Sequence, residues 1–334
     1  MARTRQVFFN SDALGITLLS VAVYTLLQSN DPSRPIRIFV VHDAGFAARG
    51  GIERIRAIVA RFPFASAWFG DFSPMLARHA DVFDNQGTRM IWAFPLCDKI
   101  LPPEVTGNIV YLDIDMLVRK DLGDLFDMDL RRDGFVAAAV NESRREHRQY
   151  LTDAGWPESA GYSFNNACTV LDLDTFRAEG FSDRMIDWYR THKAIAINTD
   201  QDCQNVAYGD RTRRLPPKWN YTDGWLERML KLNPFAREWR VFDPNEMLEA
   251  ILDPAIIHYV GPRKPTAWTH RPERKVFRQA MVALGLVPPN GRLPGETLPK
   301  IFLAGLFDAY HAALRLYARV LLSVRRRTIR LSAR

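Results

Sequence analysis

Short apolar segments alternate with helical patterns along this chain, and this alternation constrains the fold more than any other feature. Segments that predict strands lie at residues 7–9, 36–41, 109–112, 135–140, 169–173 and 256–260. Patterns that predict helices lie between some of them, at residues 52–61, 174–181 and 184–192. The strand segments are apolar almost throughout, which is typical of strands buried on both faces. The sequence therefore predicts an α/β fold whose largely parallel sheet is covered by helices on both faces.

Composition agrees with a folded domain and narrows the choice of partners. The chain has 334 residues, of which 47% are hydrophobic, and this is enough for a sizeable core. Lys and Arg number 45 against 38 Asp and Glu, but residues 315–334 contain seven arginines and no acid, so the rest of the chain is balanced. A nucleic-acid-binding domain carries its basic residues on the folded body. The charge distribution therefore argues against nucleic acid as a partner.

The cysteines and the N-terminal segment bear on the cellular compartment. Cys97, Cys168 and Cys203 are far apart and form no C-x-x-C pair, so we expect neither a disulfide framework nor a zinc site. Polar residues dilute the apolar run 13–27, and no small-residue cleavage site follows it, so this run predicts a buried helix rather than a secretory signal or a membrane span. Both features predict a cytoplasmic protein with reduced thiols.

Two carboxylates, Asp113 and Asp115, follow the predicted strand 109–112 directly. Ligands of α/β sheets bind beyond the carboxyl ends of the strands, so functional residues are expected at this point. Side chains two residues apart in an extended chain point the same way, and two like charges side by side are costly unless a cation offsets them. Mn²⁺ and Mg²⁺ accept carboxylate oxygens and can bridge to a diphosphate. The pair indicates a divalent metal site, with a solvated strand end as the alternative.

A histidine, a glycine and a lysine follow one another closely at the last predicted strand. His258 could complete a metal site begun by carboxylates, Gly261 would let the backbone approach a phosphate, and Lys264 would supply a positive charge. A lone histidine here would more often be a core residue. The spacing to the glycine and the lysine favours a functional role.

Two further polar segments complete the candidate set. Residues 198–205 are a dense run of acids and amides that includes Asp200, Gln201 and Asp202. Asparagine or threonine before acids is also good helix-capping chemistry, and this alternative stays open for Asp202. Asn165 comes directly before an apolar strand, where a buried amide would orient hydroxyl groups of a ligand.

Taken in order, these four segments resemble those of the family-eight glycosyltransferases. These are retaining, metal-dependent enzymes that use sugar nucleotides, and they include bacterial lipopolysaccharide galactosyl- and glucosyltransferases and glycogenin. The resemblance covers residues 6 to 270. It is carried by the D-x-D of Asp113 and Asp115, by Phe164-Asn165, by Asp200-Gln201-Asp202 with Asn205, and by the H-x-x-G-x-x-K-P motif His258-Tyr-Val-Gly261-Pro-Arg-Lys264-Pro265. Each motif is common alone, but all four in the family's order form a strong signal.

The resemblance implies a GT-A type, Rossmann-like domain that binds a nucleotide sugar. Asp113, Asp115 and His258 would hold Mn²⁺, with Mg²⁺ as the alternative, and the metal would grip the diphosphate of a UDP-sugar. Gly261 and Lys264 would close over the phosphates. The bound metal would neutralise the charge that builds on the leaving diphosphate.

The resemblance also assigns residues to the base and to the donor sugar. Asn10 and Asp12, at the end of the first strand, would bind the nucleotide base. Asn165, Asp200 and Gln201 would line the donor sugar as catalytic residues. Retention would arise through a covalent intermediate or through same-face attack within an ion pair, and the sequence favours neither.

The sequence departs from the family pattern at four places, one of which is a spacing of two extra residues between Lys264-Pro265 and Trp268. Residues 13–15 are Ala-Leu-Gly, where the family has an acidic or amide residue and a tyrosine that stacks on the base. Asn166-Ala167 replaces the usual Ala-Gly and adds bulk where a sugar would fit. Residues 92–96 contain no arginine to match the one that often precedes the D-x-D motif. The metal triad is intact, so the departures suggest an unusual donor or lowered activity.

The resulting prediction is a Mn²⁺-dependent retaining transferase that moves a hexose from UDP-glucose or UDP-galactose to a glycan or lipid-linked glycan, as in lipopolysaccharide biosynthesis. One alternative is a haloacid-dehalogenase-type phosphatase, because Asp113-Ile-Asp115 and Asp172-Leu-Asp174 both look like its nucleophile motif. The other is a sugar-nucleotide-binding protein that has lost its activity. Residues 144–162 are a candidate acceptor loop, with a plain exposed loop equally compatible.

The C-terminal part of the chain differs in character. We expect residues 1–285 to form the transferase domain and residues 286–334 a linker and a basic tail. Residues 300–329 predict a helix, whose apolar side chains recur at steps of three and four: Leu303, Leu306, Phe307, Tyr310, Leu314, Tyr317, Leu321 and Val324. A basic amphipathic helix is typical of peripheral proteins on an anionic membrane, here the inner face of the cell membrane. A helix packed on the body with a solvated basic face is the alternative.

Overall fold

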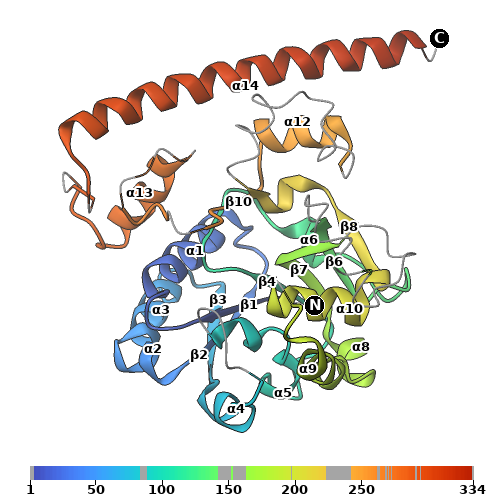
Figure 1. Cartoon of the computed structure of the whole chain (residues 1–334). Helices are drawn as coiled ribbons and strands as arrows, with labels where there is room; N and C mark the ends of the chain where they lie inside the picture. The colour runs from blue at the N-terminus through green and yellow to red at the C-terminus, as the bar shows by residue number, and fades with distance from the viewer. Residues whose placement is uncertain are drawn as a thin grey trace.

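A seven-stranded mixed sheet forms the centre of the computed structural model (Figure 1). The structure describes residues 4–82, 89–141, 152, 163–196, 198–222, 242–261, 264–267, 269, 271, 273–289, 292–293 and 295–332. The strand order is β3-β2-β1-β4-β7-β6-β8. The strands are β1 (Arg5–Ser11), β2 (Ile36–His42), β3 (Ala65–Asp71), β4 (Asn108–Leu112), β6 (Ala137–Asn141), β7 (Phe164–Asp172) and β8 (Thr212–Leu215).

Strand β7 runs against its neighbours in a sheet that is otherwise parallel. β1 pairs in parallel with β2 and β4, β2 with β3, and β6 with β8, whereas β7 is antiparallel to both β4 and β6. The amino end of β7 therefore lies at the same edge as the carboxyl ends of β1 and β4. Polar residues that open β7 thus meet polar residues that follow the other two strands. The predicted largely parallel sheet is confirmed with this exception.

Helices cover both faces of the sheet because neighbouring side chains of a strand point to opposite sides. Val7 and Phe9 lie in one core together with residues of α1 (Ile16–Ser29) and α3 (Gly51–Val59). Phe8 lies in a second core, which includes residues of α8 (Leu173–Ala178), α9 (Phe181–His192) and α10 (Thr199–Tyr208). The helix α1 confirms the buried helix predicted at 13–27. Among the described residues, no helix combines the length and the apolar character that a membrane crossing needs.

A second, three-stranded sheet brings distant parts of the chain together. Its order is β5-β10-β9, with β5 (Met116–Val118), β9 (Tyr221–Thr222) and β10 (Ile256–His258). β10 is antiparallel to β5, and His258 pairs with Met116. The last strand predicted from the sequence therefore ends directly beside the D-x-D turn between β4 and β5.

The remaining helices flank these sheets. They are α2 (Ala44–Ala48), α4 (Ser73–Arg78), α5 (Cys97–Ile100), α6 (Gly123–Phe126), α12 (Pro244–Leu252), α13 (Arg274–Ala283) and α14 (Leu298–Ser332), with 3-10 turns η1 (Arg89–Ala93), η3 (Gly209–Arg211) and η4 (Pro217–Asn220). The helix predicted at 300–329 is confirmed as α14, which lies along one end of the molecule beside α12 (Figure 1).

The structure corrects several predicted elements. β3, β5, β8 and β9 were not predicted, because β3 and β8 carry partly exposed side chains and the other two are very short. The helix predicted at 174–181 ends at Ala178, since Gly180 adopts φ +64° and begins α9. The strand predicted at 169–173 begins at Phe164 and ends at Asp172. The cysteines are buried thiols, as expected.

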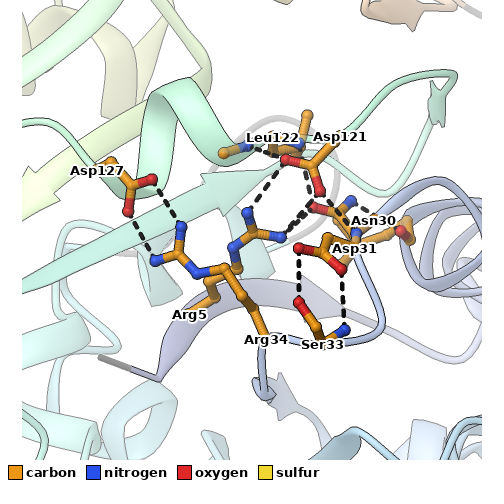
Figure 2. A network of polar contacts seen from close by, with 10 residues as sticks. Arg5, Asn30, Asp31, Ser33, Arg34, Asp121, Leu122 and Asp127 are labelled. Carbon is orange, nitrogen blue, oxygen red and sulfur yellow. Dashed lines mark hydrogen bonds and ion pairs between the residues drawn. The ribbon is translucent and has the colours of Figure 1, made fainter. Parts of the chain in front are cut away.

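A buried arginine ties the first strand to the chain that leaves β5 (Figure 2). Arg5 is 4% exposed and donates to both carboxylate oxygens of Asp121, at 2.9 and 3.2 Å. Asn30, at the end of α1, accepts a hydrogen bond from the backbone N–H of Leu122 at 3.1 Å. Nearby, the more exposed Arg34 donates to both oxygens of Asp127. The network holds β1, α1 and the segment behind the D-x-D turn in one arrangement.

Replacing Arg5 tests this network. We expect Arg5→Ala to lower the free energy of unfolding by about 1–3 kcal/mol, because the partly buried Asp121 loses its charge partner. Arg34→Ala removes an exposed pair of similar geometry and should cause a smaller loss. Urea denaturation of both variants measures the difference. Equal losses would contradict a special role for the buried arginine.

Candidate functional site

Asp113, Asp115 and His258 converge at the edge where β4 and β10 end. The Nε2 atom of His258 lies 3.3 Å from Asp115 Oδ1 and 3.7 Å from Asp113 Oδ2. One ligand atom of each of the three residues lies within 4.8 Å of the others. Two carboxylates and an imidazole nitrogen suit a Mn²⁺-type cation. The residues predicted as metal ligands are therefore brought together in an arrangement that fits the metal.

Backbone pairing holds both carboxylates in place. The N–H of Asp113 donates to the carbonyl of Ala167 at 2.9 Å, which continues the pairing of β4 with β7. The N–H of Tyr259 donates to the carbonyl of Asp115 at 3.0 Å, which continues the pairing of β5 with β10. The buried Tyr111 hydroxyl also donates to Asp113 Oδ1 at 2.5 Å. Each carboxylate is thus fixed by a different sheet.

Burial and neighbouring charges shift the pKa values of all three candidate metal ligands. Burial, and next to it the neighbouring Asp115, raise the pKa of Asp113 to about 6. Burial also acts to raise the pKa of Asp115, but His258 and Lys264 outweigh it and hold that pKa below its usual range. Burial acts to lower the pKa of His258, yet the Asp115 carboxylate raises it. The cluster therefore favours an added positive charge.

Lys264 and Gly261 lie on the segment that follows β10. The ammonium group of Lys264 contacts the Asp115 carboxylate and donates to the carbonyl of Tyr259 at 2.7 Å. Gly261 has φ +86°, a backbone conformation that other residues adopt only under strain. The glycine in this position therefore turns the chain so that the lysine reaches back to the carboxylates.

A cleft of about 300 Å³ opens beside the three candidate ligands. Among the predicted site residues, it is lined by Asn10, Asp12, Asp113, Asp115, Asp200 and Lys264. Asn165, Gln201, His258 and Gly261 lie outside this lining. The carboxyl ends of β1 and β4 and the start of α10 therefore form one hollow, as the sequence predicts, and some predicted residues lie behind it.

Asp12 lines the cleft and also stabilises the turn that follows β1. Its Oδ1 atom accepts hydrogen bonds from the backbone N–H groups of Leu14 and Gly15, at 2.9 and 3.0 Å. A Cβ atom on Gly15 would lie 2.4 Å from Cδ1 of Ile114, so the missing side chain lets this turn pack closely against the D-x-D turn. Leu14 is 83% exposed. The departure from the family pattern at 13–15 therefore makes a tight turn with an exposed apolar side chain.

Helix α10 presents Asp200 to the cleft. Asn166 donates to Asp200 Oδ2 at 2.6 Å, and both residues line the cleft. Asp202 is buried and accepts a hydrogen bond from the backbone N–H of Asn198 at 2.9 Å, so it links back to the residue before the helix. Asn205 exchanges hydrogen bonds with both backbone groups of Phe164, at 2.8 and 3.0 Å. The helix is thereby fixed against the start of β7.

One buried residue of the site was not predicted. Asn220 is 1% exposed and lies between His258 and Asn165, with hydrogen bonds of 2.9 and 2.7 Å to them. No pattern around it distinguishes it from an ordinary turn asparagine. Its position depends on η4 meeting β10 and β7, which only the folded chain reveals.

Two other predictions from the sequence concern the second phosphatase-like motif and the acceptor loop. Asp172 and Asp174, the second phosphatase-like motif, are both bound by Arg131 at 2.8–2.9 Å, outside the cleft. The candidate acceptor loop 144–162 lies outside the described residues, apart from Thr152.

The pH dependence of stability tests the environment of Asp200. Burial, followed by the nearby Asp113, raises the pKa of Asp200 to about 7. The folded chain then binds the proton more tightly than the unfolded chain, so ionisation destabilises the fold as pH rises from about 4 to 7. We expect Asp200→Asn to lose less stability across this window than the wild-type protein, in urea denaturation without divalent cations. Asp210→Asn, at an exposed position, serves as control, and an unchanged pH slope in Asp200→Asn would contradict the assignment.

Comparison with known proteins agrees with this geometry. The model of glycosyl transferase family 8 matches residues 99–270, just over half of the chain. General stress protein A of Bacillus subtilis is 24% identical over 243 residues, which cover 72% of this chain and 80% of that protein. Probable UDP-glucose:glycoprotein glucosyltransferase A of Dictyostelium discoideum is 29% identical over 154 residues, which cover 43% of this chain but 9% of that protein.

Solved structures share the fold. The galactosyltransferase LgtC, in complex with donor and acceptor sugar analogues, aligns with a TM-score of 0.65 at 22% identity, over 85% of this chain and 98% of that one. The glycosyltransferase GlyE of Streptococcus pneumoniae aligns with a TM-score of 0.59 at 19% identity, over 85% of this chain and 62% of that one. These likenesses show a GT-A type fold. With the family model matched across the D-x-D and H-x-x-G-x-x-K-P segments, the chain belongs to glycosyl transferase family 8 and is a glycosyltransferase.

Proposed function

We propose that this glycosyltransferase retains configuration and moves a hexose from UDP-glucose or UDP-galactose to a glycan or lipid-linked glycan, with Mn²⁺ as its metal. One observation carries the proposal: Asp113, Asp115 and His258 meet beside a cleft that Lys264 also lines. A divalent cation and a diphosphate together satisfy these charges. The Dictyostelium relative, which is named for UDP-glucose, also supports the choice of donor.

Different residues around the cleft would bind the metal and the diphosphate. Asp113, Asp115 and His258 would hold Mn²⁺, which supplies a Lewis acid for the negative charge on the leaving group. Lys264 would exchange part of its contact with Asp115 for a phosphate oxygen, since an ammonium group binds either anion. The turn at Gly261, which has a positive φ, would bring the backbone of the same segment to the phosphates.

Other cleft residues would select the base and the sugar. Asn10 donates to the carbonyl of Met90 at 2.6 Å, and its Oδ1 atom has no partner among the described residues, so it is available to a base edge. Asp200 would accept a hydrogen bond from a sugar hydroxyl, and Asn166 holds it from behind. We assign Asn165 and Gln201, outside the lining, to the far side of the donor sugar. The added bulk at Asn166 predicts a donor preference that differs from that of relatives with a small residue there.

Nucleotide release from a panel of sugar nucleotides tests the proposal. With Mn²⁺, we expect a UDP-hexose to give nucleoside diphosphate, and Asp115→Asn to reduce the rate by more than about 100-fold with little effect on thermal unfolding, because a metal ligand is lost. A phosphomonoester serves as control for phosphatase activity. Turnover that survives in Asp115→Asn would contradict the metal assignment. Mn²⁺-dependent binding of donors without turnover would instead favour a binding protein.

We also propose that α14 places the protein on an anionic membrane surface, at the inner face of the cell membrane. One side of the helix packs on the body through His311, Ala318 and Leu322, and Arg315 pairs with Glu273. A separate side carries exposed large apolar residues, which are Phe302, Leu303, Leu306, Tyr310, Leu316, Tyr317 and Val320. An apolar surface of this kind next to an arginine-rich segment suits the interface of an anionic bilayer.

Charge substitutions on this apolar side test membrane binding. We expect the double substitution of Leu306→Glu and Tyr317→Glu to reduce co-sedimentation with phosphatidylglycerol vesicles about tenfold, because apolar insertion is lost and anionic repulsion is added. Ile195→Glu, at an exposed apolar residue outside α14, is the control, and donor hydrolysis in solution should stay unchanged. Undiminished sedimentation of the double variant would overturn the proposal.

A further inference from the structure

Three amide side chains form a hydrogen-bonded row behind the cleft, between His258 and α10. The Nδ1 atom of His258 lies 2.9 Å from Asn220 Oδ1. Asn220 Nδ2 donates to Asn165 Oδ1 at 2.7 Å, and Asn165 Nδ2 donates to Gln201 Oε1 at 3.2 Å. Asn220, Gln201 and His258 are each at most 5% exposed, so water cannot easily replace these bonds. The row joins four separate elements, η4, β7, α10 and β10.

The direction of the row is set by one backbone group. An amide side chain can exchange its oxygen and nitrogen by a half-turn, so its direction needs an anchor that cannot turn. The backbone N–H of Ala167, which can only donate, bonds to Asn165 Oδ1 at 3.1 Å. This bond fixes the Asn165 oxygen at that end. Asn220 meets the same oxygen and must therefore turn its nitrogen toward it, which leaves its own oxygen for His258.

The anchor lies at an irregularity in β7. The pairing of β6 with β7 shifts register between Ala139 and Val140, whose partners are Thr169 and Asn165. The residues between these partners are left out of the ladder with β6, and Ala167, whose N–H bonds to Asn165, is one of them. Irregularities of this kind are common next to active sites, where they re-aim side chains.

We propose that Asn220 is a positioning residue that sets both ends of the site through this row. At one end, its oxygen accepts the Nδ1–H of His258, so the Nε2 lone pair is directed to the cation held by Asp113 and Asp115. At the other end, its N–H joins that of Ala167 in holding Asn165 in the orientation that donates to Oε1 of Gln201. The inference rests on the proposed metal-dependent transfer and adds how the chain orients its own groups for it.

The same direction defines what Gln201 offers to the reaction. Its oxygen is engaged by Asn165, while its buried Nε2 atom has no partner among the described residues. Gln201 is therefore oriented as a hydrogen-bond donor through Nε2.

Two substitutions of Asn220 test its bond to His258 and its bond to Asn165 separately. Asn220→Asp keeps an oxygen for His258 but has no N–H for Asn165, so we expect Mn²⁺ affinity to be kept and kcat to fall about tenfold or more. Asn220→Ala loses both bonds, and we expect Mn²⁺ affinity to fall about 10–100-fold together with kcat, as for other residues that orient a metal ligand. Mn²⁺ binding is measured without donor, by electron paramagnetic resonance of the free ion. Nucleoside diphosphate release gives kcat and KM.

The control is Asn30→Ala, which removes a buried asparagine with bonds to Leu26 and Leu122 and no contact with the site. It should lose stability without a change in Mn²⁺ affinity or kcat. If Asn220→Ala fails to fold, the comparison of Mn²⁺ affinity with kcat in Asn220→Asp decides the test alone. Equal changes of affinity and kcat in Asn220→Asp, or none, would overturn the proposal. Absence of Mn²⁺ binding by the wild-type protein would instead refute the proposed function.

Discussion

The placement of two carboxylates side by side in a largely buried turn is the constraint on which the rest of the site depends. Burial, and next to it the charge of Asp115, make Asp113 harder to ionise. His258 and Lys264 offset this cost in part, since both contact Asp115. A divalent cation offsets it more fully, because it carries two charges and binds both acids at once. The fold maintains an arrangement that is unfavourable without a positive partner.

The topology of the sheets explains how the fold maintains it. The backbone of Asp113 is held by β7 and that of Asp115 by β10, so neither residue can move away as a whole without breaking a strand pairing. The reversed direction of β7 also places Asn165 and Asn166 at the same edge. The cost of the paired acids is thus carried by the backbone pairing of two sheets.

Much of this architecture follows from the sequence, for physical reasons that also explain the gaps. Strands buried on both faces are apolar throughout, so β1, β2 and β4 were predictable, whereas β8 reads Thr-Arg-Arg-Leu and carries exposed arginines. The acids of the D-x-D motif and His258 were predictable because they end apolar strands. Asn220 was not, because its role arises only where η4 meets β10 and β7. The apolar stripe of α14 was also predictable, but tertiary docking decides which of its residues stay exposed.

The account stands on a single cation held jointly by the two acids and the histidine. The most direct test is a crystal structure of the protein with Mn²⁺ and UDP, with anomalous scattering recorded to locate manganese. The account predicts one manganese peak, bonded to Asp113, Asp115 and Nε2 of His258 and to diphosphate oxygens. Manganese bound elsewhere, or a diphosphate held in the cleft without a metal at these three residues, would contradict it.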